Sequence, residues 1–566
     1  MGIKGRDKEF RLTKVTHVDY KHIEIDRTLL NLFPRLKFDG YAARFKNSTH
    51  LITVERFVEE FTDEKNTSKF RGFAAHRGIV RKWLETDLLD LVNRGRPTQA
   101  VVAPRPLHGN TYKFRNTKHA RDYGTSEQLY AMLYHAQKGQ AARDTLKRFI
   151  FAGLDLHTDK IQTSVKIDVE TQAILHLDEQ VKQDAADSKE PDRYPPLCLG
   201  QADLLADDIL RLLAYENYIP RSVLVDYLKT LLSFHLGLYH LRLLKLLPEL
   251  VRRRESSSSC TVHACQLAPD KPFPRLNCLC HIGLVVDMGD TSNTHMAELA
   301  RRSADMHYRR IPAYVQAQFV MKKLDEMADY LAKVHKLPMP TAGYFSIGDL
   351  LHLLASPWNT EREAYFKMKL ASLIEGTSTE KDAALDPEIQ RVTEMKLGDF
   401  ETYIEILVAL RASFHRRYIT ECLDSLLLKN SESGLLRQSR TKGSPRRFVL
   451  GSRLLEALLQ IAVLAPNGAA FTTREIRIDE LLLFLRERYG IYIDCLPPND
   501  GFGKPSIIDQ QTLRTNREVF KTRLREIGFF QDLSDAYITQ TVTPRYTITA
   551  QNSSGAGGLG SKGGKG

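Results

Sequence analysis

Cysteine and histidine side chains gather in one short stretch of the chain, where they could bind a metal ion. Six candidate ligands fall within 22 residues, as two clusters separated by twelve residues: Cys260, His263, Cys265, Cys278, Cys280 and His281. Two short ligand clusters of this kind are typical of structural zinc sites. Their spacings differ from the usual Cys-x2-Cys, and six ligands exceed the four of a tetrahedral ion. The stretch therefore predicts either a structural zinc ion or a reduced, metal-free loop.

Acidic residues that follow predicted strands could hold a divalent metal for hydrolysis. Asp155 and Asp159 follow a predicted strand near residue 150, and Asp287 and Asp290 follow the apolar run 282–286. Carboxylates in such places bind Mg²⁺ or Mn²⁺ in nucleases. Turns and helix caps use the same residue types far more often. A metal-dependent nuclease subunit is therefore an alternative interpretation, and no catalytic residue is assigned.

A predicted helix at about 509–527 carries side chains suited to DNA. Its apolar positions, among them Leu513, Phe520 and Leu524, would bury one face. The opposite face is expected to present Gln511, Thr512, Arg514, Thr515, Asn516, Arg517, Lys521 and Arg525. Side chains of these types contact base edges and phosphates when a recognition helix lies in the major groove. The helix is therefore predicted to bind double-stranded DNA.

The elements around this helix follow the order of a winged helix. Apolar residues with helical spacing predict two earlier helices, the first over 454–462. Thr472 with Glu475 resembles a capping box before the second, whose apolar stripe runs over 478–489, and Gly490 supplies its end. Two short strands predicted at 537–542 and 545–548 would form the wing. Residues 448–548 are thus predicted to be a winged-helix DNA-binding module. The same fold can serve in protein contacts alone, which is the alternative.

Positive charge is concentrated in the first quarter of the chain. The net charge is +12, from 81 Lys and Arg against 69 Asp and Glu; residues 1–150 hold 29 bases and 17 acids, so the remainder holds 52 of each. Between residues 71 and 121, aromatic side chains alternate with the bases, a mixture typical of nucleic-acid grooves. The candidate DNA contacts there are Arg77, Arg81, Lys82, Lys113, Arg115 and Lys118.

The expected fold is mainly α and multidomain. The predicted parts are a basic α+β domain at 1–148, a mostly helical middle at 149–430 with a Cys/His-rich insertion at 256–290, a basic linker at 431–447, the winged helix at 448–548 and a disordered Gly/Lys tail at 549–566. A chain of 566 residues exceeds the usual size of a single core.

Several classes of protein are disfavoured by what the sequence lacks. It has no phosphate-binding loop of the Gly-x4-Gly-Lys-Ser/Thr type, no His-Glu-x2-His and no dinucleotide fingerprint after a strand. No run reaches the roughly 20 uncharged apolar residues of a membrane helix. Seven cysteines, four of them within 21 positions, do not suit a disulfide scaffold. We expect a cytoplasmic protein without membrane contact.

Two phrases of the sequence carry a resemblance to a known family. They are Arg488-Tyr489-Gly490-Ile491-Tyr492-Ile493-Asp494 and Phe529-Phe530-Gln531-Asp532-Leu533-Ser534-Asp535-Ala536-Tyr537. Over its whole length the chain resembles components of bacterial anti-phage defence islands, in particular the seventh component of the methylation-associated defence system. The resemblance implies a DNA methyltransferase, ATPases and a kinase as partners, with phage DNA as the eventual target. It implies no catalytic residues.

These observations together predict a DNA-binding accessory or scaffold subunit of a multi-protein, restriction-like defence system. The basic N-terminal domain and the winged helix would each contact DNA, and the helical middle would hold them apart and dock partners. The alternatives are the nuclease subunit, a helical scaffold that binds proteins only, and a transcriptional regulator.

Overall fold

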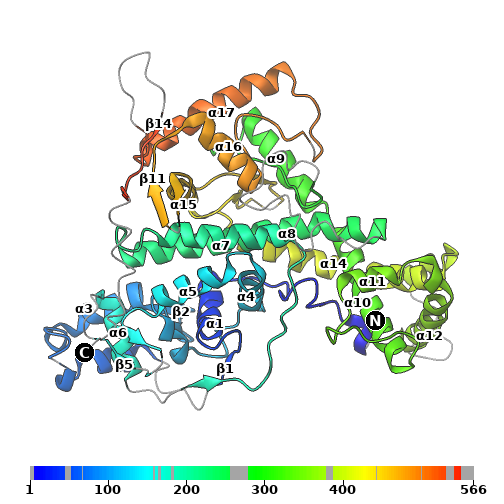
Figure 1. The fold of residues 1–566 in the computed structure, drawn as a ribbon, viewed down its shortest axis with the longest axis horizontal. Helices are drawn as coiled ribbons and strands as arrows, with labels where there is room; N and C mark the ends of the chain where they lie inside the picture. Colours follow the sequence, from blue (N-terminus) through cyan, green and yellow to red (C-terminus); the bar gives the residue numbers. More distant parts are fainter. Residues whose placement is uncertain are drawn as a thin grey trace, which may run out of the picture.

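The computed structural model shows a mainly helical protein whose helices surround one long central helix (Figure 1). The structure describes residues 5–44, 53–66, 68–156, 158, 160–162, 167–179, 184–254, 278–377, 387–441, 443–468, 470–498, 500–530 and 541–549. Within these ranges, every sheet has two strands. The predicted mainly α class is therefore confirmed.

The central helix is α8 (Arg221–Arg253), and most of its side chains are buried. Its leucine-rich sequence is apolar on several faces, as expected of a helix that has neighbours all round it. Pro220 precedes the first turn, and Arg254 ends the helix with a φ of 58°. The helices packed around it are α7 (Leu199–Leu213), α10 (Ile311–Lys333), α14 (Asp399–Leu426) and α15 (Ser452–Ala462).

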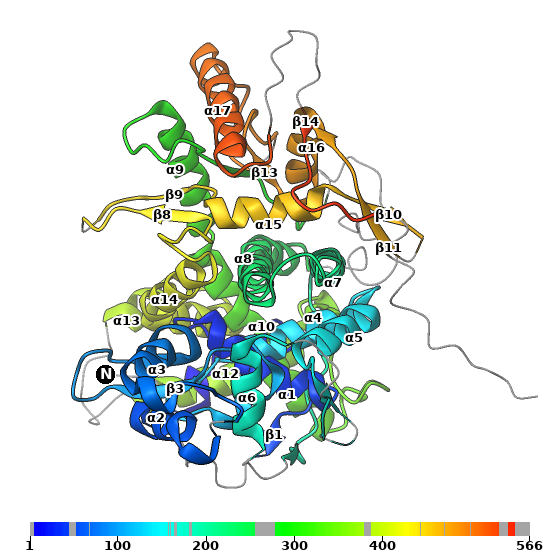
Figure 2. The same ribbon diagram turned by 90° about the vertical axis from the view of Figure 1, so that its left-hand side faces the viewer.

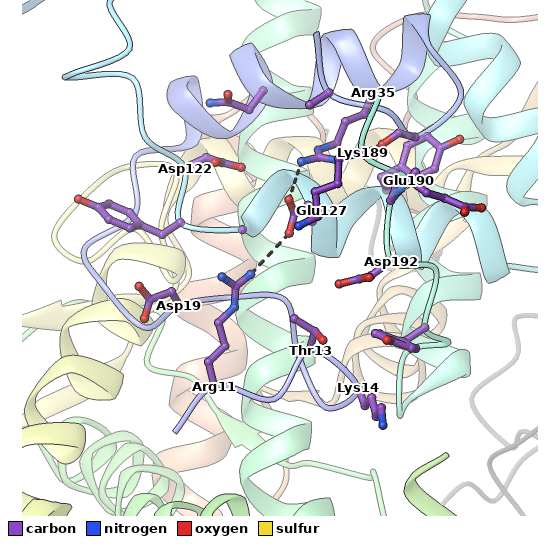
Figure 3. A pocket seen from close by; sticks show the side chains of 18 of the residues that line it. Arg11, Thr13, Lys14, Asp19, Arg35, Asp122, Glu127, Lys189, Glu190 and Asp192 are labelled. Carbon is purple, nitrogen blue, oxygen red and sulfur yellow. Dashed lines mark hydrogen bonds and ion pairs between the residues drawn. The ribbon is translucent and has the colours of Figure 1, made fainter. Parts of the chain in front are cut away.

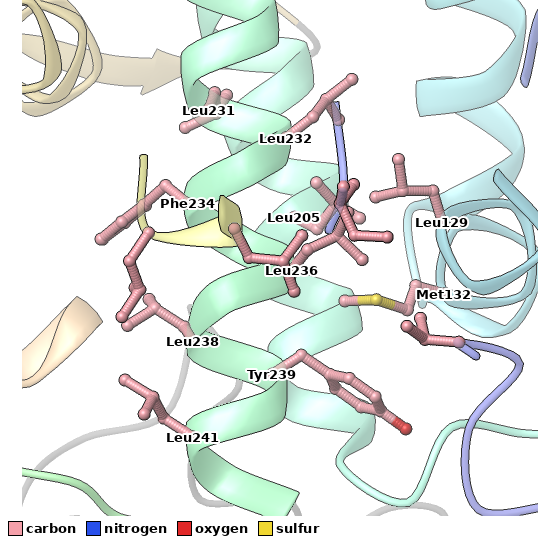
Figure 4. Close-up of a cluster of buried hydrophobic side chains, with 14 of the residues drawn as sticks. Leu129, Met132, Leu205, Leu231, Leu232, Phe234, Leu236, Leu238, Tyr239 and Leu241 are labelled. Carbon is pink, nitrogen blue, oxygen red and sulfur yellow. The ribbon is translucent and has the colours of Figure 1, made fainter. Parts of the chain in front are cut away.

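Figure 4 shows the core on one side of α8, where leucines meet α4 (Thr125–His135). Leu232 and Leu236 of α8 and Leu129 and Met132 of α4 are all 0% exposed. Complete burial of one such side chain contributes about 1.5–3 kcal/mol relative to an exposed one. One connected cluster of buried apolar side chains extends from Phe10 to Ile548. The N-terminal, middle and C-terminal parts of the chain therefore pack against one another.

The N-terminal part lies on the opposite side of α8 from the C-terminal helices (Figures 1 and 2). Its strands form three antiparallel pairs. Its helices are α1 (Ile25–Lys37), α2 (Val54–Thr62), α3 (Arg77–Trp83), α5 (Gly139–Ile150) and α6 (Val169–Asp178), and its strands are β1 (Ala43–Arg44), β2 (Leu89–Val92), β3 (Ala100–Pro104), β4 (Leu154–Asp155), β5 (Lys160–Ile161) and β6 (Ala185–Ala186).

The middle of the chain continues as helices beyond the end of α8. They are α9 (His295–Tyr308), α10, α11 (Ile347–His352), α12 (Asn359–Thr377), α13 (Pro387–Glu394) and α14. The long helical pattern that begins at Thr294 is divided between α9 and α10, because the chain turns at Arg309 and Arg310 and Pro312 stands in the first turn of α10.

The C-terminal part contains α15, α16 (Ile478–Tyr489) and α17 (Ile507–Glu526), whose apolar stripes match the predicted ones. The predicted capping box is wrong, because Thr472 lies in a strand and Arg477 is the residue before α16. Two short strands, β10 (Leu464–Asn467) and β11 (Ala470–Thr473), form a hairpin after α15. Strand β12 (Ile476–Arg477) leads directly into α16 and pairs antiparallel with β14 (Thr541–Val542). Phe530, just after α17, bridges to Val542 in the antiparallel sense. Most of the predicted wing, 531–540, lies outside the described residues.

The segment predicted as a basic linker, 431–447, forms structure of its own. Strands β8 (Leu436–Gln438) and β9 (Arg446–Phe448) pair as an antiparallel hairpin. Arg446 donates two hydrogen bonds of 2.7 Å to Asp424, and Arg447 pairs with Asp290 at 2.6 Å. The composition of this segment predicted a basic linker because the acids that neutralise these arginines lie elsewhere in the chain.

A short parallel strand pair joins the C-terminal part to the middle. Strand β13 (Ile491–Tyr492) pairs with β7 (Leu284–Val285). Gly490 ends α16 with a φ of 76°, as predicted, and a Cβ atom there would lie 2.2 Å from the Ile282 carbonyl oxygen. Glycine is therefore required both by the backbone angle and by the close approach of the neighbouring strand. The phrase 488–494 thus forms a junction between two parts of the fold.

Among the described residues, no helix is both long enough and apolar enough to cross a membrane.

Candidate nucleic-acid interface

Helix α17 is held in place at its start and along one face. Ser506 and Asp509 form a capping box: the Asp509 amide donates to the Ser506 hydroxyl at 3.2 Å, and the Ser506 amide donates to the Asp509 carboxylate at 2.8 Å. His295 of α9 contacts the same carboxylate at 2.7 Å. Leu513, Phe520 and Leu524 are buried, as predicted. The helix therefore has a fixed inner face and a defined outer face.

The outer face of α17 carries half of the side chains predicted to contact DNA. Gln511, Arg514, Thr515 and Arg525 are exposed. Arg514 forms no hydrogen bond or ion pair with another described residue, and neither does Lys504, in the loop before the helix. Figures 1 and 2 show α17 at the edge of the molecule, beside α9. An extended ligand could lie along this face without displacing another element.

Two further side chains that were predicted to contact DNA are half-buried. Thr512 is half-buried. Arg517 is also half-buried and pairs at 2.6 Å with Asp479 in the first turn of α16. An arginine in such a pair can still contact a phosphate, but part of its charge is already neutralised.

Asn516 and Lys521 face inward, which corrects the prediction for these two residues. Asn516 is 3% exposed; its amide nitrogen donates to the carbonyl oxygens of Val286 and Ile493, at 2.9 and 2.8 Å, and its oxygen accepts from the Met288 amide at 2.9 Å. It thereby fastens α17 to the chain around β7 and β13. Lys521 is 8% exposed and pairs with Glu518 at 2.7 Å.

The residues of the N-terminal part that were predicted to contact DNA also differ in their exposure. Arg77, Arg81, Lys82 and Lys118 are exposed. Arg81 pairs with Glu55 and with Glu85, while Arg77 donates to the Thr62 hydroxyl at 3.2 Å. Lys82 forms no hydrogen bond or ion pair with another described side chain. Lys82 is therefore a candidate of this group whose charge no described side chain neutralises.

Lys113, by contrast, lies inside the N-terminal part, which corrects its prediction as a DNA contact, and Arg115 is half-buried. Lys113 is 4% exposed and pairs with Asp178 at 2.8 Å. Burial lowers the pKa of the Arg115 guanidinium to about 10, and the side chain bonds to Asn31. Both cations neutralise or satisfy groups of the protein itself.

The aromatic residues between these bases belong to the core. Trp83 packs edge-on against Phe61 and Phe73, with ring centroids 5.8 and 5.7 Å apart. Tyr112 is 0% exposed and Phe114 is 6% exposed. The alternation of aromatic and basic residues therefore reflects one face packed inward and one face in water, and it gives no stacking platform for bases.

A charged pocket of about 950 Å³ lies between the N-terminal part and α10 (Figure 3). Glu127 stands between Arg35 at 2.6 Å and Arg11 at 3.5 Å. Lys14 is neutralised in the same way by Asp325 at 2.5 Å. Because acidic side chains line the pocket in about the same number as basic ones, it offers no net cationic field for a phosphate.

The predicted metal ligands are only partly within the described residues. Cys260, His263 and Cys265 lie outside them. Cys280 is buried and its thiol hydrogen-bonds to that of Cys198, an interaction that lowers the pKa of Cys198. No group of three or more Cys, His, Asp or Glu side chains in the described ranges is placed to hold a metal ion. Structural zinc stays a prediction, which measurement of the metal content of the purified protein would test.

The carboxylates of the nuclease alternative are divided among several places. Asp159 lies outside the described residues. Asp287 is 2% exposed, accepts from the Gly289 amide at 2.9 Å, and has its pKa raised chiefly by burial. Asp290 pairs with Arg437 and Arg447. Asp155, in β4, belongs to the N-terminal part on the other side of α8. The described acids do not form a metal cluster.

These features define a mainly helical protein that presents a polar, partly cationic helix at its surface. The family described as Methylation-associated defense system protein MAD7 matches residues 5–546, nearly the whole chain, and the chain belongs to this family. It is therefore a component of a methylation-associated defence system, which serves antiviral defence. No curated protein and no solved structure matches the chain.

Proposed function

We propose that this component is a DNA-binding subunit of its defence system and that α17 is the helix that contacts the duplex. The observation that carries the proposal is the outer face of α17, where Gln511, Arg514 and Thr515 are exposed together and Arg514 has no partner among the described residues. Glutamine and arginine are the side chains that form paired hydrogen bonds with the major-groove edges of adenine and guanine.

The arrangement of the surrounding elements supports a winged-helix interpretation. Helices α15, α16 and α17 follow one another, and β12, between the first two, pairs with β14, which follows the third. The bridge from Phe530 to Val542 adds a second strand position at the start of the wing. In winged helices the third helix enters the major groove and the wing lies against the neighbouring backbone.

Other subunits of the system are the proposed partners of the helical middle. The resemblance suggests a methyltransferase, ATPases and a kinase.

The start of α17 carries two exposed apolar side chains. Ile507 and Ile508 are 75% and 62% exposed. Phe502 and Leu513 line a pocket of about 630 Å³ whose lining also includes Gln510 of α17. Exposed apolar residues favour a protein contact, which is the second candidate function for this end of α17.

The test is binding of purified protein to labelled duplex DNA over a salt series. The variant Gln511→Ala/Arg514→Ala removes the two exposed side chains, and Gln390→Ala/Arg391→Ala on α13 is the matched control, since both residues there are exposed. Loss of one base contact costs about 1–3 kcal/mol, which raises Kd about 5- to 150-fold. We expect this loss for the α17 variant, with a salt dependence shallower by about one unit for each phosphate contact removed.

Other outcomes would favour the alternatives. Equal binding by the two variants would exclude α17 as the DNA contact. Absence of binding by the wild type, even at low salt, would favour the protein-only scaffold and the apolar contact at Ile507. Cleavage of the duplex that requires Mg²⁺ or Mn²⁺ and is lost in Asp287→Ala would favour the nuclease.

A further inference from the structure

The turn between β2 and β3 is a short, internally bonded hairpin tip with the sequence Asn93-Arg94-Gly95-Arg96-Pro97-Thr98-Gln99. The Arg96 amide donates to the Asn93 carbonyl at 3.0 Å, and the Gln99 amide donates to the Arg96 carbonyl at 2.9 Å. The Gly95 amide donates to the Gln99 side chain at 2.8 Å. These bonds fix the backbone of the tip before any ligand arrives, which lowers the entropic cost of binding.

Two cations at this tip form no side-chain hydrogen bond or ion pair with another described residue. The side chains of Arg94 and Arg96 are exposed. The charge of Arg94 acts on Asp90, where it partly opposes the rise in pKa that burial causes. Many of the chain's other exposed arginines are paired with acids, as Arg81 is with Glu55. The tip therefore carries two exposed guanidinium groups two residues apart, in the quarter of the chain that holds the whole net charge.

Gly95 between them has no side chain and a φ of 71°, and nothing lies within 4 Å of the position that a Cβ atom would take. The open space shows that packing within the protein does not require glycine here, whereas the left-handed backbone angle favours it. Glycine permits both the left-handed angle and a close approach of backbone to a ligand.

We propose that this hairpin tip is a minor-groove contact for A·T-rich duplex DNA, with Arg94 and Arg96 as the inserted side chains. A·T tracts have a narrow minor groove with enhanced negative potential, which attracts arginine. The groove is about 6 Å wide, so that a thin turn without a central side chain can approach it while a helix cannot. Pro97 follows the second arginine. Its fixed φ limits the backbone conformations of the turn that carries the two arginines.

The contact is separate from α17. The N-terminal part and α17 lie on opposite sides of α8 in Figures 1 and 2. The inference rests on the proposed function in naming DNA as the ligand, but it uses different residues and a different groove. Two contacts on one chain would raise the overall affinity through effective concentration.

The experiment compares fluorescence-anisotropy titrations of the full chain with an A·T-tract duplex and a G·C-rich duplex of the same length. The hairpin variant is Arg94→Ala/Arg96→Ala, and its charge-matched control is Arg391→Ala/Arg417→Ala, two exposed helical arginines. We expect the wild type and the control to prefer the A·T duplex about tenfold, and the hairpin variant to lose this preference. A small minor-groove ligand such as netropsin should compete with the wild type and not with the hairpin variant.

The α17 variant separates this inference from the proposed function. If Gln511→Ala/Arg514→Ala weakens binding while the hairpin variant matches its control, α17 binds DNA and the hairpin inference is wrong. If the hairpin variant loses the A·T preference and the α17 variant matches its own control, the inference stands and α17 is not the DNA contact. Equal affinity of the wild type for the two duplexes, or tighter binding to single-stranded RNA, would overturn the minor-groove assignment.

Discussion

Acidification from pH 7 to about pH 5 is expected to unfold the protein, because four histidines are buried in their neutral form. Burial lowers the pKa of His108 and His307 to about 3, with Arg221 and Arg310 adding to the effect, and lowers the pKa of His240 and His415 to about 4. In the unfolded chain a histidine titrates near 6.5.

The sign follows from the number of bound protons. Between about pH 4 and pH 6.5 the unfolded chain binds more protons at these positions than the folded one, so the free energy of unfolding falls as the pH falls through this window. At pH 5 each group lowers it by about 2 kcal/mol, and the four together by about 8 kcal/mol, against a total of about 5–15 kcal/mol for a typical domain.

Tryptophan fluorescence and far-UV circular dichroism over a pH series measure the acid midpoint. The His415 ring stacks on Phe10 with centroids 3.9 Å apart, so His415→Phe keeps an aromatic ring and removes the proton site. We expect it to lower the midpoint by about half a pH unit. The same change at the exposed His76 should leave the midpoint where it is. A protein that stays folded at pH 4 would contradict this account.

The helices could be predicted from the sequence because their apolar periodicity is local. The patterns at 201–250 and 509–527 correspond to α7, α8 and α17, and the apolar positions of α17 that were predicted to be buried, Leu513, Phe520 and Leu524, are buried. A helix needs one stripe of apolar residues and suitable ends, and both can be read within about twenty positions. The same holds for Gly490, whose role as a helix end is visible from its place after the stripe of α16.

The exposure of individual polar residues could not be predicted, because it depends on elements far away in the chain. Asn516 is buried because the chain just after β7 and β13 contacts the middle of α17, and its partner Val286 is 230 positions away. Lys113 is buried because α6 brings Asp178 to it, 65 residues along the chain. The arginines of β9 are neutralised by acids from two other elements. A single sequence shows the charges in these cases and not their partners.

The two distinctive residues at the start of the phrase 488–494 act in a buried polar network. Arg488 donates to Asp208 at 2.9 Å and to Asp207 at 2.7 Å, the Tyr489 hydroxyl donates to Asp208 at 2.8 Å, and His235 lies 2.9 Å from the same carboxylate. Burial alone would raise the pKa of Asp208, but Arg488 and the His235 hydrogen bond outweigh it and hold that pKa below its ordinary value. The network joins α16 to α7 and α8.

Replacing Arg488 by methionine is therefore expected to lower the free energy of unfolding by about 3–5 kcal/mol, since it leaves the carboxylate of Asp208, 0% exposed, without its cation. Urea denaturation measures the loss, and hydrogen exchange of the α16 amides should report it first, because that helix depends on the junction. The control is Arg474→Ala, which breaks a pair with Glu480 whose side chains are 48% and 42% exposed and which contributes less than about 1 kcal/mol. If Arg488→Met costs no more than this control, the junction does not depend on the ion pair, and the parallel strands β7 and β13 with Gly490 must hold α16 in place.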